Sequence, residues 1–178
     1  MRQAGRYLPE FREIRKLNPD FINLCLNDDL CSEITLQPLK RFDLSAAIIF
    51  SDILMVPYGL KQKVNFKKDF GPQLGEVNLK DVSKEEFLKK LKPIYSCINK
   101  IKSNNLIRNK NLIGFIGAPW TLLIYMINKK SPKKKIDSGF FDNKNLINEI
   151  LKKLEKFLII HIENQIDNGA DIIQIFDS

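Results

Sequence analysis

Charged side chains suited to binding an ionic ligand stand in two separate segments of the sequence. Arg2 and Arg6 lie four residues apart around Gln3, Ala4 and Gly5. Small residues between two guanidinium groups let both backbone and charge approach an anion, and guanidinium groups grip carboxylates or phosphates in a bidentate manner. The segment is therefore a candidate anion site, with a solvated basic terminus as the open alternative.

Asp52 is the second candidate, because it directly follows the apolar run 46–50. Ligands of parallel α/β folds lie beyond the carboxyl ends of the strands, where this carboxylate would face a pocket with few competing partners. A helix cap or a loop ion pair is the alternative role. Ser178 and Asp177 follow another apolar run and share this ambiguity. For Tyr125, core packing and a hydroxyl directed at a ligand are equally compatible with the sequence.

Histidine and cysteine give weaker indications of chemistry. His161 is the only histidine and lies between two isoleucines in a helical pattern, which favours a packed side chain over a catalytic one. Cys25, Cys31 and Cys97 are odd in number and widely spaced, which favours reduced thiols over a disulfide framework or a zinc site. We expect no metal role for these cysteines.

The elements that would position these residues alternate between apolar runs and helical patterns. The runs 46–50, 112–117 and 170–176 have the composition of parallel strands buried on both faces. Ser83 and Glu86 have capping-box spacing and predict a helix over about 84–102. A second helix is predicted to begin after residue 142 or 143 and to end at Gly169. The segment 61–80 is expected to form a long loop or hairpin, and 131–138 a surface connection.

Strand, helix, strand, helix and strand in this order indicate a parallel α/β architecture, either a doubly wound sheet or a (β/α)8 TIM barrel. No dinucleotide or nucleotide glycine motif follows any of the strands, which favours the barrel. A complete barrel usually takes roughly 250 residues. This chain has 178, and its last strand has no covering helix.

Charge and hydropathy limit the classes of partner. The sequence has 29 basic and 21 acidic residues and a formal net charge of +8, which favours anionic partners of an unspecified kind. No apolar run approaches the roughly 18 residues of a membrane helix, and no secretory signal follows Met1, so we expect a cytoplasmic protein without a membrane partner. The basic runs lack interleaved aromatic residues, which argues against nucleic-acid binding.

Four separated segments, in order, closely resemble the uroporphyrinogen decarboxylase family: residues 1–12, 46–54, 117–122 and 169–178. The resemblance spans the chain but covers about the first half of a family member. It implies a TIM barrel of which 1–178 is a partial domain, truncated at both ends, since the family's opening strand normally precedes Met1. We therefore expect the isolated 178-residue polypeptide to be poorly soluble or partly folded, and inactive.

The resemblance also implies an activity. The family removes the carboxyl groups of four acetate side chains from uroporphyrinogen III, giving coproporphyrinogen III and CO2 in haem biosynthesis, without a metal or organic cofactor. Its members are cytoplasmic, and a homodimer is expected of the full-length protein. The substrate is an anionic tetrapyrrole with eight carboxylates, so the positive charge of the chain matches it.

Residue roles follow from the same resemblance. Asp52 matches the aspartate that faces the pyrrole N–H groups and stabilises the cationic intermediate, in an ionised form that neighbouring arginines would favour. Arg2 is a candidate for the proton relay, although a water or a substrate carboxyl could be the donor. Trp120 is expected to shape the wall of the cavity. The matched residues expected to bind substrate are Arg2, Gln3, Ala4, Gly5, Arg6, Arg15, Tyr125 and Ser178.

Two other functions compete with the decarboxylase. Cobalamin-dependent methyltransferases that bind zinc share the fold family, but no His-x-Cys sequence stands at the strand ends here. A basic, non-catalytic fragment or nucleic-acid-binding module would explain the charge but not the four matching segments.

Overall fold

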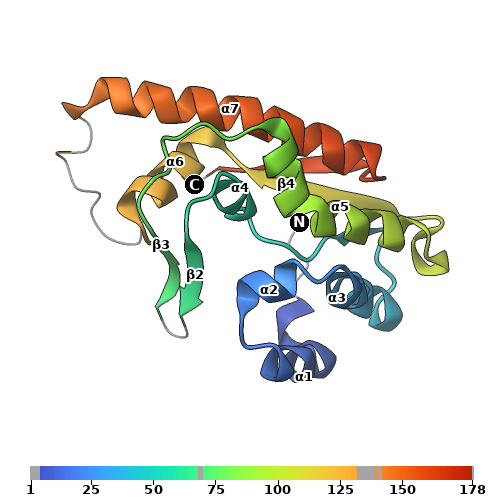
Figure 1. The fold of residues 1–178 in the computed structure, drawn as a ribbon. Helices are drawn as coiled ribbons and strands as arrows, with labels where there is room; N and C mark the ends of the chain where they lie inside the picture. Colours follow the sequence, from blue (N-terminus) through green and yellow to red (C-terminus); the bar gives the residue numbers. More distant parts are fainter. Residues whose placement is uncertain (1–4, 68–69, 132–138, 140–141, 178) are drawn as a thin grey trace.

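The computed structural model describes residues 5–67, 70–131, 139 and 142–177 of the chain. Helices and strands alternate along it (Figure 1). In order they are η1 (Gly5–Tyr7), α1 (Pro9–Leu17), α2 (Phe21–Cys25), α3 (Asp28–Arg41), β1 (Ala46–Ile48), α4 (Met55–Gly59), β2 (Val64–Lys67), β3 (Gly71–Leu74), α5 (Lys84–Lys102), η2 (Asn105–Ile107), β4 (Asn111–Gly117), α6 (Pro119–Asn128), α7 (Lys144–Asp167) and β5 (Ile172–Phe176).

The three predicted apolar strands form one parallel sheet in the order β1-β4-β5. Ala46 of β1 pairs with Asn111 of β4, and Gly117 of β4 pairs with Phe176 of β5. Each strand therefore lies beside the next one along the chain, after a helical crossover, as in the successive units of a β/α barrel. The prediction of a parallel α/β architecture of the barrel type is confirmed, and the described strands make up part of such a barrel.

The two long crossover helices have the ends that the sequence predicted. Ser83 caps α5 through its side chain, which accepts a hydrogen bond from the Glu86 amide at 3.1 Å, and the Glu86 carboxylate accepts one from the Ser83 amide at 3.2 Å. At α7, the Asn143 side chain accepts a hydrogen bond from Leu146 at the start. Gly169 ends the helix with φ of +114°, a conformation that residues with a Cβ rarely adopt.

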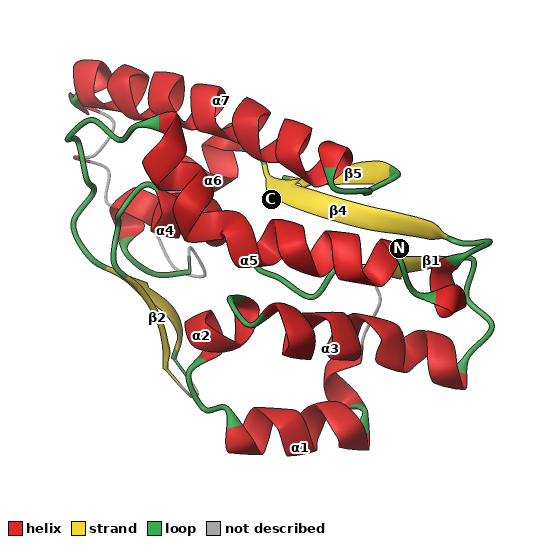
Figure 2. Cartoon of the chain, turned by 45° about the vertical axis from the view of Figure 1, so that its right-hand side comes forward, coloured by secondary structure: helices red, strands yellow, loops and turns green. Residues whose placement is uncertain are grey.

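An N-terminal helical layer, α1 to α3, was not predicted from the apolar pattern. Its helices begin at strong local signals, namely Pro9 in the first turn of α1, the Asp20 side chain capping α2 and the Asn27 side chain capping α3. Figure 2 shows α3, α5 and α7 running alongside the sheet, with α1 outermost. In this layer α3 packs against β1 and contributes side chains to the candidate site described below.

The segment 61–80 contains the antiparallel hairpin β2–β3, in which Val64 pairs with Leu74. The prediction of a hairpin there is confirmed. The Gln62 side chain ties its base to the rest of the chain by donating to the carbonyls of Gly75 and Met126, each at 2.9 Å. The predicted surface connection at 131–138 lies outside the described residues except for Ser131.

The buried core lies between the sheet and the crossover helices. The rings of Phe87 in α5 and Phe157 in α7 pack with centroids 4.8 Å apart. Beside them the Tyr95 hydroxyl lies 2.9 Å from Nδ1 of His161, which is 4% exposed. Burial lowers the pKa of His161 to about 4, so this histidine is a neutral core residue, as predicted.

The three thiols are free and buried, in agreement with the prediction of reduced cysteines. Cys31 donates from Sγ to the Leu24 carbonyl at 3.1 Å, and burial raises the pKa of Cys25. Neither environment favours a reactive thiolate.

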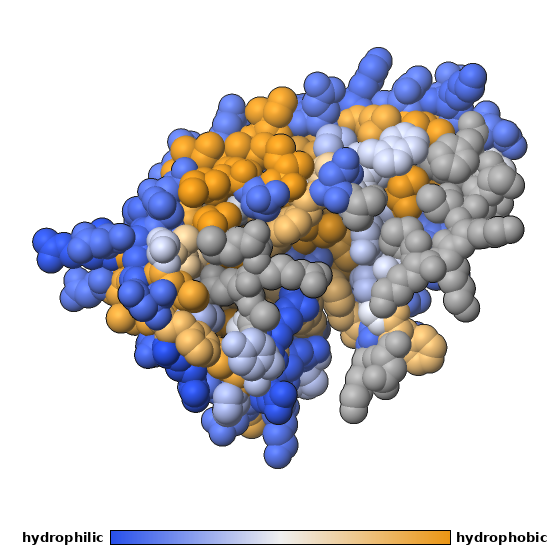
Figure 3. Space-filling model, turned by 180° about the vertical axis from the view of Figure 1, so that it is seen from behind, coloured by the Kyte–Doolittle hydropathy of each residue, from blue (hydrophilic) through white to orange (hydrophobic). Residues whose placement is uncertain are grey.

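Strand β5 departs from the prediction that all three strands are buried on both faces. Ile172, Ile175 and Phe176 are 46%, 53% and 40% exposed, whereas Leu112 of β4 is fully buried. The reason is topological, because β5 pairs only with β4 among the described strands and no described element covers its other side. Seen from behind, the molecule has a broad apolar patch in its upper part (Figure 3), and the large exposed apolar residues of this region are Ile159, Ile166, Ile172, Ile175 and Phe176.

Candidate functional site

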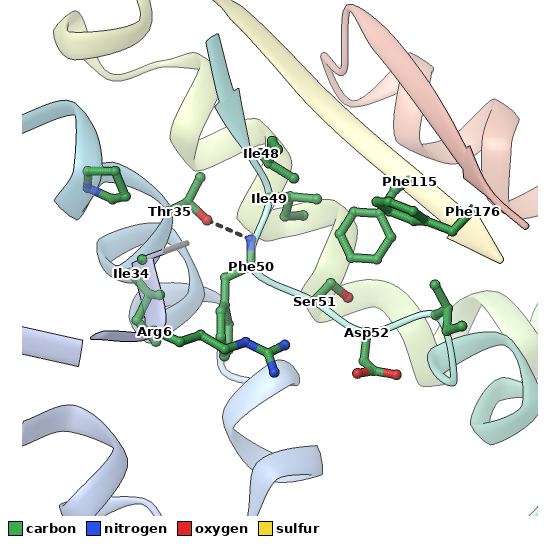
Figure 4. A pocket seen from close by; sticks show the side chains of 13 residues that line it. Arg6, Ile34, Thr35, Ile48, Ile49, Phe50, Ser51, Asp52, Phe115 and Phe176 are labelled. Carbon is green, nitrogen blue, oxygen red and sulfur yellow. Dashed lines mark hydrogen bonds between the residues drawn. The ribbon is translucent and has the colours of Figure 1, made fainter. Parts of the chain in front are cut away.

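A cavity of about 490 Å³ opens beyond the carboxyl end of β1. It is lined by the end of that strand and the segment that follows, including Phe50, Ser51 and Asp52, and by Gly5 and Arg6 from the N-terminal turn η1. Figure 4 shows the Arg6 guanidinium and the Asp52 carboxylate beyond the strand end, with the aromatic rings of Phe115 and Phe176 at the other side. The cavity therefore combines one acidic and one basic side chain with an apolar wall.

Asp52 is held by the backbone of the turn that leads into α4. Its Oδ1 accepts a hydrogen bond from the Leu54 amide at 3.0 Å, and its carbonyl accepts one from the Met55 amide at 3.1 Å. One carboxylate oxygen thus stabilises the turn before α4, whose N-cap residue is Leu54 and has no side-chain cap, so the alternative role of a helix cap is not observed. Because the side chain also lines the cavity, the turn contact and ligand contact are compatible here.

Burial is the largest influence on the pKa of Asp52 and raises it above its ordinary value of 3.8. The Leu54 amide and the charge of Arg6 act in the opposite direction but are weaker. The expectation that nearby arginines would favour the ionised form has the correct sign for Arg6, yet the overall shift is upward. A carboxylate in such a poorly solvated place interacts strongly with any positive charge that forms beside it.

Arg6 is positioned by two aromatic rings. Its guanidinium carbon lies 5.4 Å from the centroid of Phe21 and 5.9 Å from that of Phe50. Cation–π contacts of this kind fix the guanidinium plane without consuming its hydrogen-bond donors. Gly5 allows the turn to approach α3, because a Cβ at this position would lie 3.2 Å from Cγ of Pro38.

A second concavity, which we call the outer groove, adjoins the first and shares Arg6 with it. It encloses about 1090 Å³ and is lined by Arg6, Phe11, Arg12, Arg15, Lys16, Pro19, Phe21, Phe66 and Lys67. The predicted site residue Arg15 lies here, with its guanidinium carbon 5.6 Å from the Phe21 centroid and Nη1 donating to the Asn18 carbonyl. The structure thus brings Gly5, Arg6 and Asp52 to one cavity and places Arg15 in the adjoining outer groove.

The other predicted site residues are not brought to this cavity. Tyr125 lies on α6, partly buried against the core, and does not line the cavity. Trp120 is 45% exposed and also lies outside the lining, in contrast to the expectation that it shapes the wall. Four predicted residues fall outside the described part of the chain: Arg2, Gln3, Ala4 and Ser178.

Asp177, which directly follows β5, is held by α6. Its Oδ1 accepts a hydrogen bond from the Thr121 hydroxyl at 2.8 Å. In the same region the Ala118 amide donates to the Phe176 carbonyl at 2.7 Å. These bonds tie the carboxyl ends of β4 and β5 together beside the Phe176 ring.

Several lining residues were not identified from the sequence. Thr35 and Pro38 of α3 lie against the cavity, and the Thr35 hydroxyl accepts a hydrogen bond from the Phe50 amide at 2.9 Å while donating to the Cys31 carbonyl. Phe115 and Phe176 form the apolar wall, with ring centroids 5.5 Å apart. Their aromatic character was visible in the strands, but the pairing register was needed to place them together.

The described residues show neither a membrane-spanning helix nor a cluster of metal ligands. None of the helices in the described part of the chain is long and apolar enough to span a membrane. Within those same residues, no group of three or more histidine, cysteine, aspartate or glutamate side chains could hold a metal ion.

Fold and cavity together define a chain of the β/α-barrel class with a carboxylate and a guanidinium at the end of its first described parallel strand. The sequence model described as "Uroporphyrinogen decarboxylase (URO-D)" matches residues 1–178. The chain belongs to the uroporphyrinogen decarboxylase family.

Two relatives show how much of a family member the chain represents. It is 44% identical over 185 residues to a uroporphyrinogen decarboxylase of Campylobacter jejuni and 42% identical over 187 residues to one of Rickettsia bellii. Both alignments cover 100% of this chain and 54% of the relative. The chain therefore spans about half the length of the curated relatives that it matches.

A solved structure supports the fold alone. A methyltransferase from Methanosarcina mazei superposes with a TM-score of 0.68 at 14% sequence identity, covering 92% of this chain and 50% of that one. At this identity the likeness confirms the arrangement of helices and strands and carries no information on chemistry.

Proposed function

We propose that this chain supplies the reaction centre of a uroporphyrinogen decarboxylase, a carboxy-lyase that converts the four acetate side chains of uroporphyrinogen III to methyl groups. The observation that supports it best is the position of Asp52 in the family's matching segment, half-buried at a strand end and accompanied by Arg6 in one cavity. The reaction is inferred from membership of the family. The cavity contains a carboxylate suited to a cationic intermediate and a guanidinium suited to a substrate carboxylate.

The chemistry requires an electron sink for the pair of electrons left when CO2 departs. Protonation of a pyrrole carbon gives a cation that accepts this pair as the bond between the acetate CH2 and its carboxyl breaks. A proton then adds to the exocyclic carbon, and the ring proton leaves to restore the pyrrole. Each acetate thus takes up one proton and loses one CO2, and the ring itself supplies the electron sink.

Asp52 is assigned to orientation and charge stabilisation in this sequence of steps. One of its oxygens is engaged by the Leu54 amide, so the other is available to the pyrrole N–H groups. A fixed carboxylate beside the ring stabilises the positive charge that develops on protonation. Poor solvation of the carboxylate strengthens this electrostatic stabilisation. The raised pKa of Asp52 has the same origin, since burial penalises an isolated negative charge and favours one paired with a cation.

We assign Arg6 to the binding of one substrate carboxylate. Arg15, in the outer groove, is assigned to the binding of another. Both guanidinium groups lie over the Phe21 ring, a contact that does not use their N–H donors, and Arg15 already gives one of its donors to the Asn18 carbonyl. Arg2, Gln3, Ala4, Gly5, Tyr125 and Ser178 remain proposed substrate-binding residues on the basis of the family match, and Arg2 the proposed participant in proton relay.

Further properties are proposed from the family. They are a homodimeric assembly of the completed protein, a cytoplasmic location, and the lack of a cofactor and of a nucleic-acid or membrane partner. Analytical ultracentrifugation of the completed chain, defined here as these 178 residues joined to the second half of the Campylobacter jejuni relative, tests the dimer directly.

The assignment of Asp52 is tested by turnover of the completed chain. We expect Asp52→Asn to lower the rate of acetate loss by about 10²-fold or more, because removal of one preorganised charge at a reacting centre has this order of effect. Asn keeps an oxygen for the Leu54 amide and removes a buried charge, so the fold should be retained.

Asp43→Asn is the matched control, since Asp43 is an exposed carboxylate at the other end of β1, 3.0 Å from Lys110. Its turnover should equal that of the parent. Retention of full activity by the Asp52→Asn variant would refute the proposed centre.

A further inference from the structure

We propose that Arg12, Lys16 and Lys67 form a second anion-binding site in the outer groove, which holds carboxylates of the same tetrapyrrole whose reacting acetate faces Asp52. The inference rests on the proposed function for the identity of the ligand. The family resemblance assigns no role to these three residues, and none of them lines the cavity that contains Asp52.

The outer groove gathers positive charge without neutralising it. Five cationic side chains line it and no acidic one does: Arg6, Arg12, Arg15, Lys16 and Lys67. Among the described residues, no ion pair joins Arg12, Lys16 or Lys67 to a carboxylate. Of the acidic residues nearest in sequence, Glu10 pairs with Arg41 at 2.7 Å and Asp20 accepts from the Asn23 amide, while Glu13 is exposed on α1 and does not line the groove. Like charges held together in this way favour binding of an anion.

The cations come from two elements that the fold fixes relative to each other. Arg12, Arg15 and Lys16 have the spacing i, i+3 and i+4 on α1, which places them on one side of the helix. Lys67 ends β2 on the opposite wall. The rings of Phe21 and Phe66, with centroids 4.5 Å apart, join these walls and form an apolar floor suited to a flat, partly apolar ligand.

Arg6 lines both concavities, so a single ligand can reach from one to the other. Uroporphyrinogen carries eight carboxylates, and only one acetate at a time can face Asp52. The remaining carboxylates require partners outside the Asp52 cavity, which has Arg6 as its only described basic lining residue. The outer groove, about 1090 Å³ in volume, provides the space and the charges for them.

The test is binding of a fluorescent porphyrin octacarboxylate to the completed chain at low ionic strength. We expect the triple variant Arg12→Gln, Lys16→Gln and Lys67→Gln to bind about tenfold more weakly, since three partly exposed ion pairs have this combined order of magnitude. It should also lose part of the preference for the octacarboxylate over a porphyrin tetracarboxylate, a change that a purely structural role would not produce.

A triple variant of equal charge, Lys89→Gln, Lys92→Gln and Lys152→Gln, is the matched control, because these lysines lie exposed on α5 and α7 away from the groove. Its affinity should stay within about twofold of the parent. Circular dichroism verifies folding, and the single variant Lys67→Glu repeats the test where the triple variant aggregates.

Equal effects of the two triple variants, or no effect of the groove variant, would overturn the second site. So would absence of binding by the parent. Turnover that still depends on Asp52 would then show that the proposed reaction centre stands and that only the outer site has failed.

Discussion

At the scale of single residues, Asp52 is placed where its ionised form reduces the stability of the fold. Its pKa in the folded chain lies above the ordinary 3.8, so the folded state holds the proton more tightly than the unfolded state does. The contribution of this group to the free energy of unfolding therefore falls as the pH rises from 3.8 through the raised pKa. Such a cost is expected of a carboxylate kept to stabilise a transient cation.

Arg6 and Asp52 also affect one another through space. The charge of Arg6 lowers the pKa of Asp52 and partly offsets burial, and the Phe21 and Phe50 rings hold the guanidinium in place. Arg6 thus favours the ionised form of the carboxylate, whereas burial acts against it and has the larger effect. A bound substrate carboxylate would engage Arg6 and leave Asp52 directed at the ring.

At the scale of elements, the contact between Tyr95 of α5 and His161 of α7 joins the two long crossover helices in the core. The pKa of His161 is about 4 when folded, against 6.5 for the ordinary side chain, so the unfolded chain binds the proton more tightly. Its contribution to stability is fully present above pH 6.5 and is lost as the pH falls towards 4.

We therefore expect the completed chain to lose up to about 3 kcal/mol of unfolding free energy through His161 over this interval, since one unit of pKa corresponds to about 1.4 kcal/mol. Urea denaturation at several pH values measures the loss. His161→Asn, which removes the only histidine of these 178 residues, should flatten the profile. Asp52→Asn serves as the control, because that carboxyl acts with the opposite sign. Identical profiles for His161→Asn and the parent would contradict the assignment.

Elements with local signals were predicted well from the sequence. The Ser83 and Glu86 pair fixed the start of α5, and Gly169 fixed the end of α7, because capping depends on residues three or four apart. The N-terminal helices were missed, since their capping signals were not accompanied by a long apolar stripe. The exposure of β5 was also missed, as burial of a strand depends on what packs against it.

The candidate site was predicted from two local signals, a carboxylate directly after an apolar strand and two arginines spaced around small residues. Asp52 and Arg6 were selected in the sequence, and the fold brings both to one cavity. Phe115 and Phe176 could not be placed together before the register of β4 and β5 was known. Lys67 lies in a hairpin, and its proximity to α1 depends on packing between Phe21 and Phe66 that has no local pattern.

At the scale of the whole molecule, the exposed apolar residues of β5 and α7 form the surface against which we expect the second half of the longer relatives to pack. The relatives extend over about twice its aligned length, and β5 has one edge with which none of the described strands pairs, with Ile172 and Ile175 exposed. We expect a further parallel strand to cover this edge in the completed chain, and uncovered strand edges of this kind to promote self-association in the isolated chain.

One substitution should then have opposite effects in the two contexts. Ile175→Lys is expected to reduce self-association of the 178-residue chain, measured by light scattering. In the completed chain it should lower the free energy of unfolding by about 2 kcal/mol or more, because the charge would be buried. Leu17→Lys, at an 81% exposed position on α1, is the control and should change neither quantity. A completed chain that tolerates Ile175→Lys without loss would show that this face stays open.

We propose that this chain carries the reaction centre for removal of acetate carboxyl groups from a reduced tetrapyrrole. This is tested by the amount of CO2 released per macrocycle when the completed chain is given uroporphyrinogen III under anaerobic conditions, with mass analysis of the tetrapyrrole. We expect loss of all four acetate carboxyl groups and formation of coproporphyrinogen III. A folded, dimeric completed chain that binds the macrocycle and releases no CO2 would contradict it.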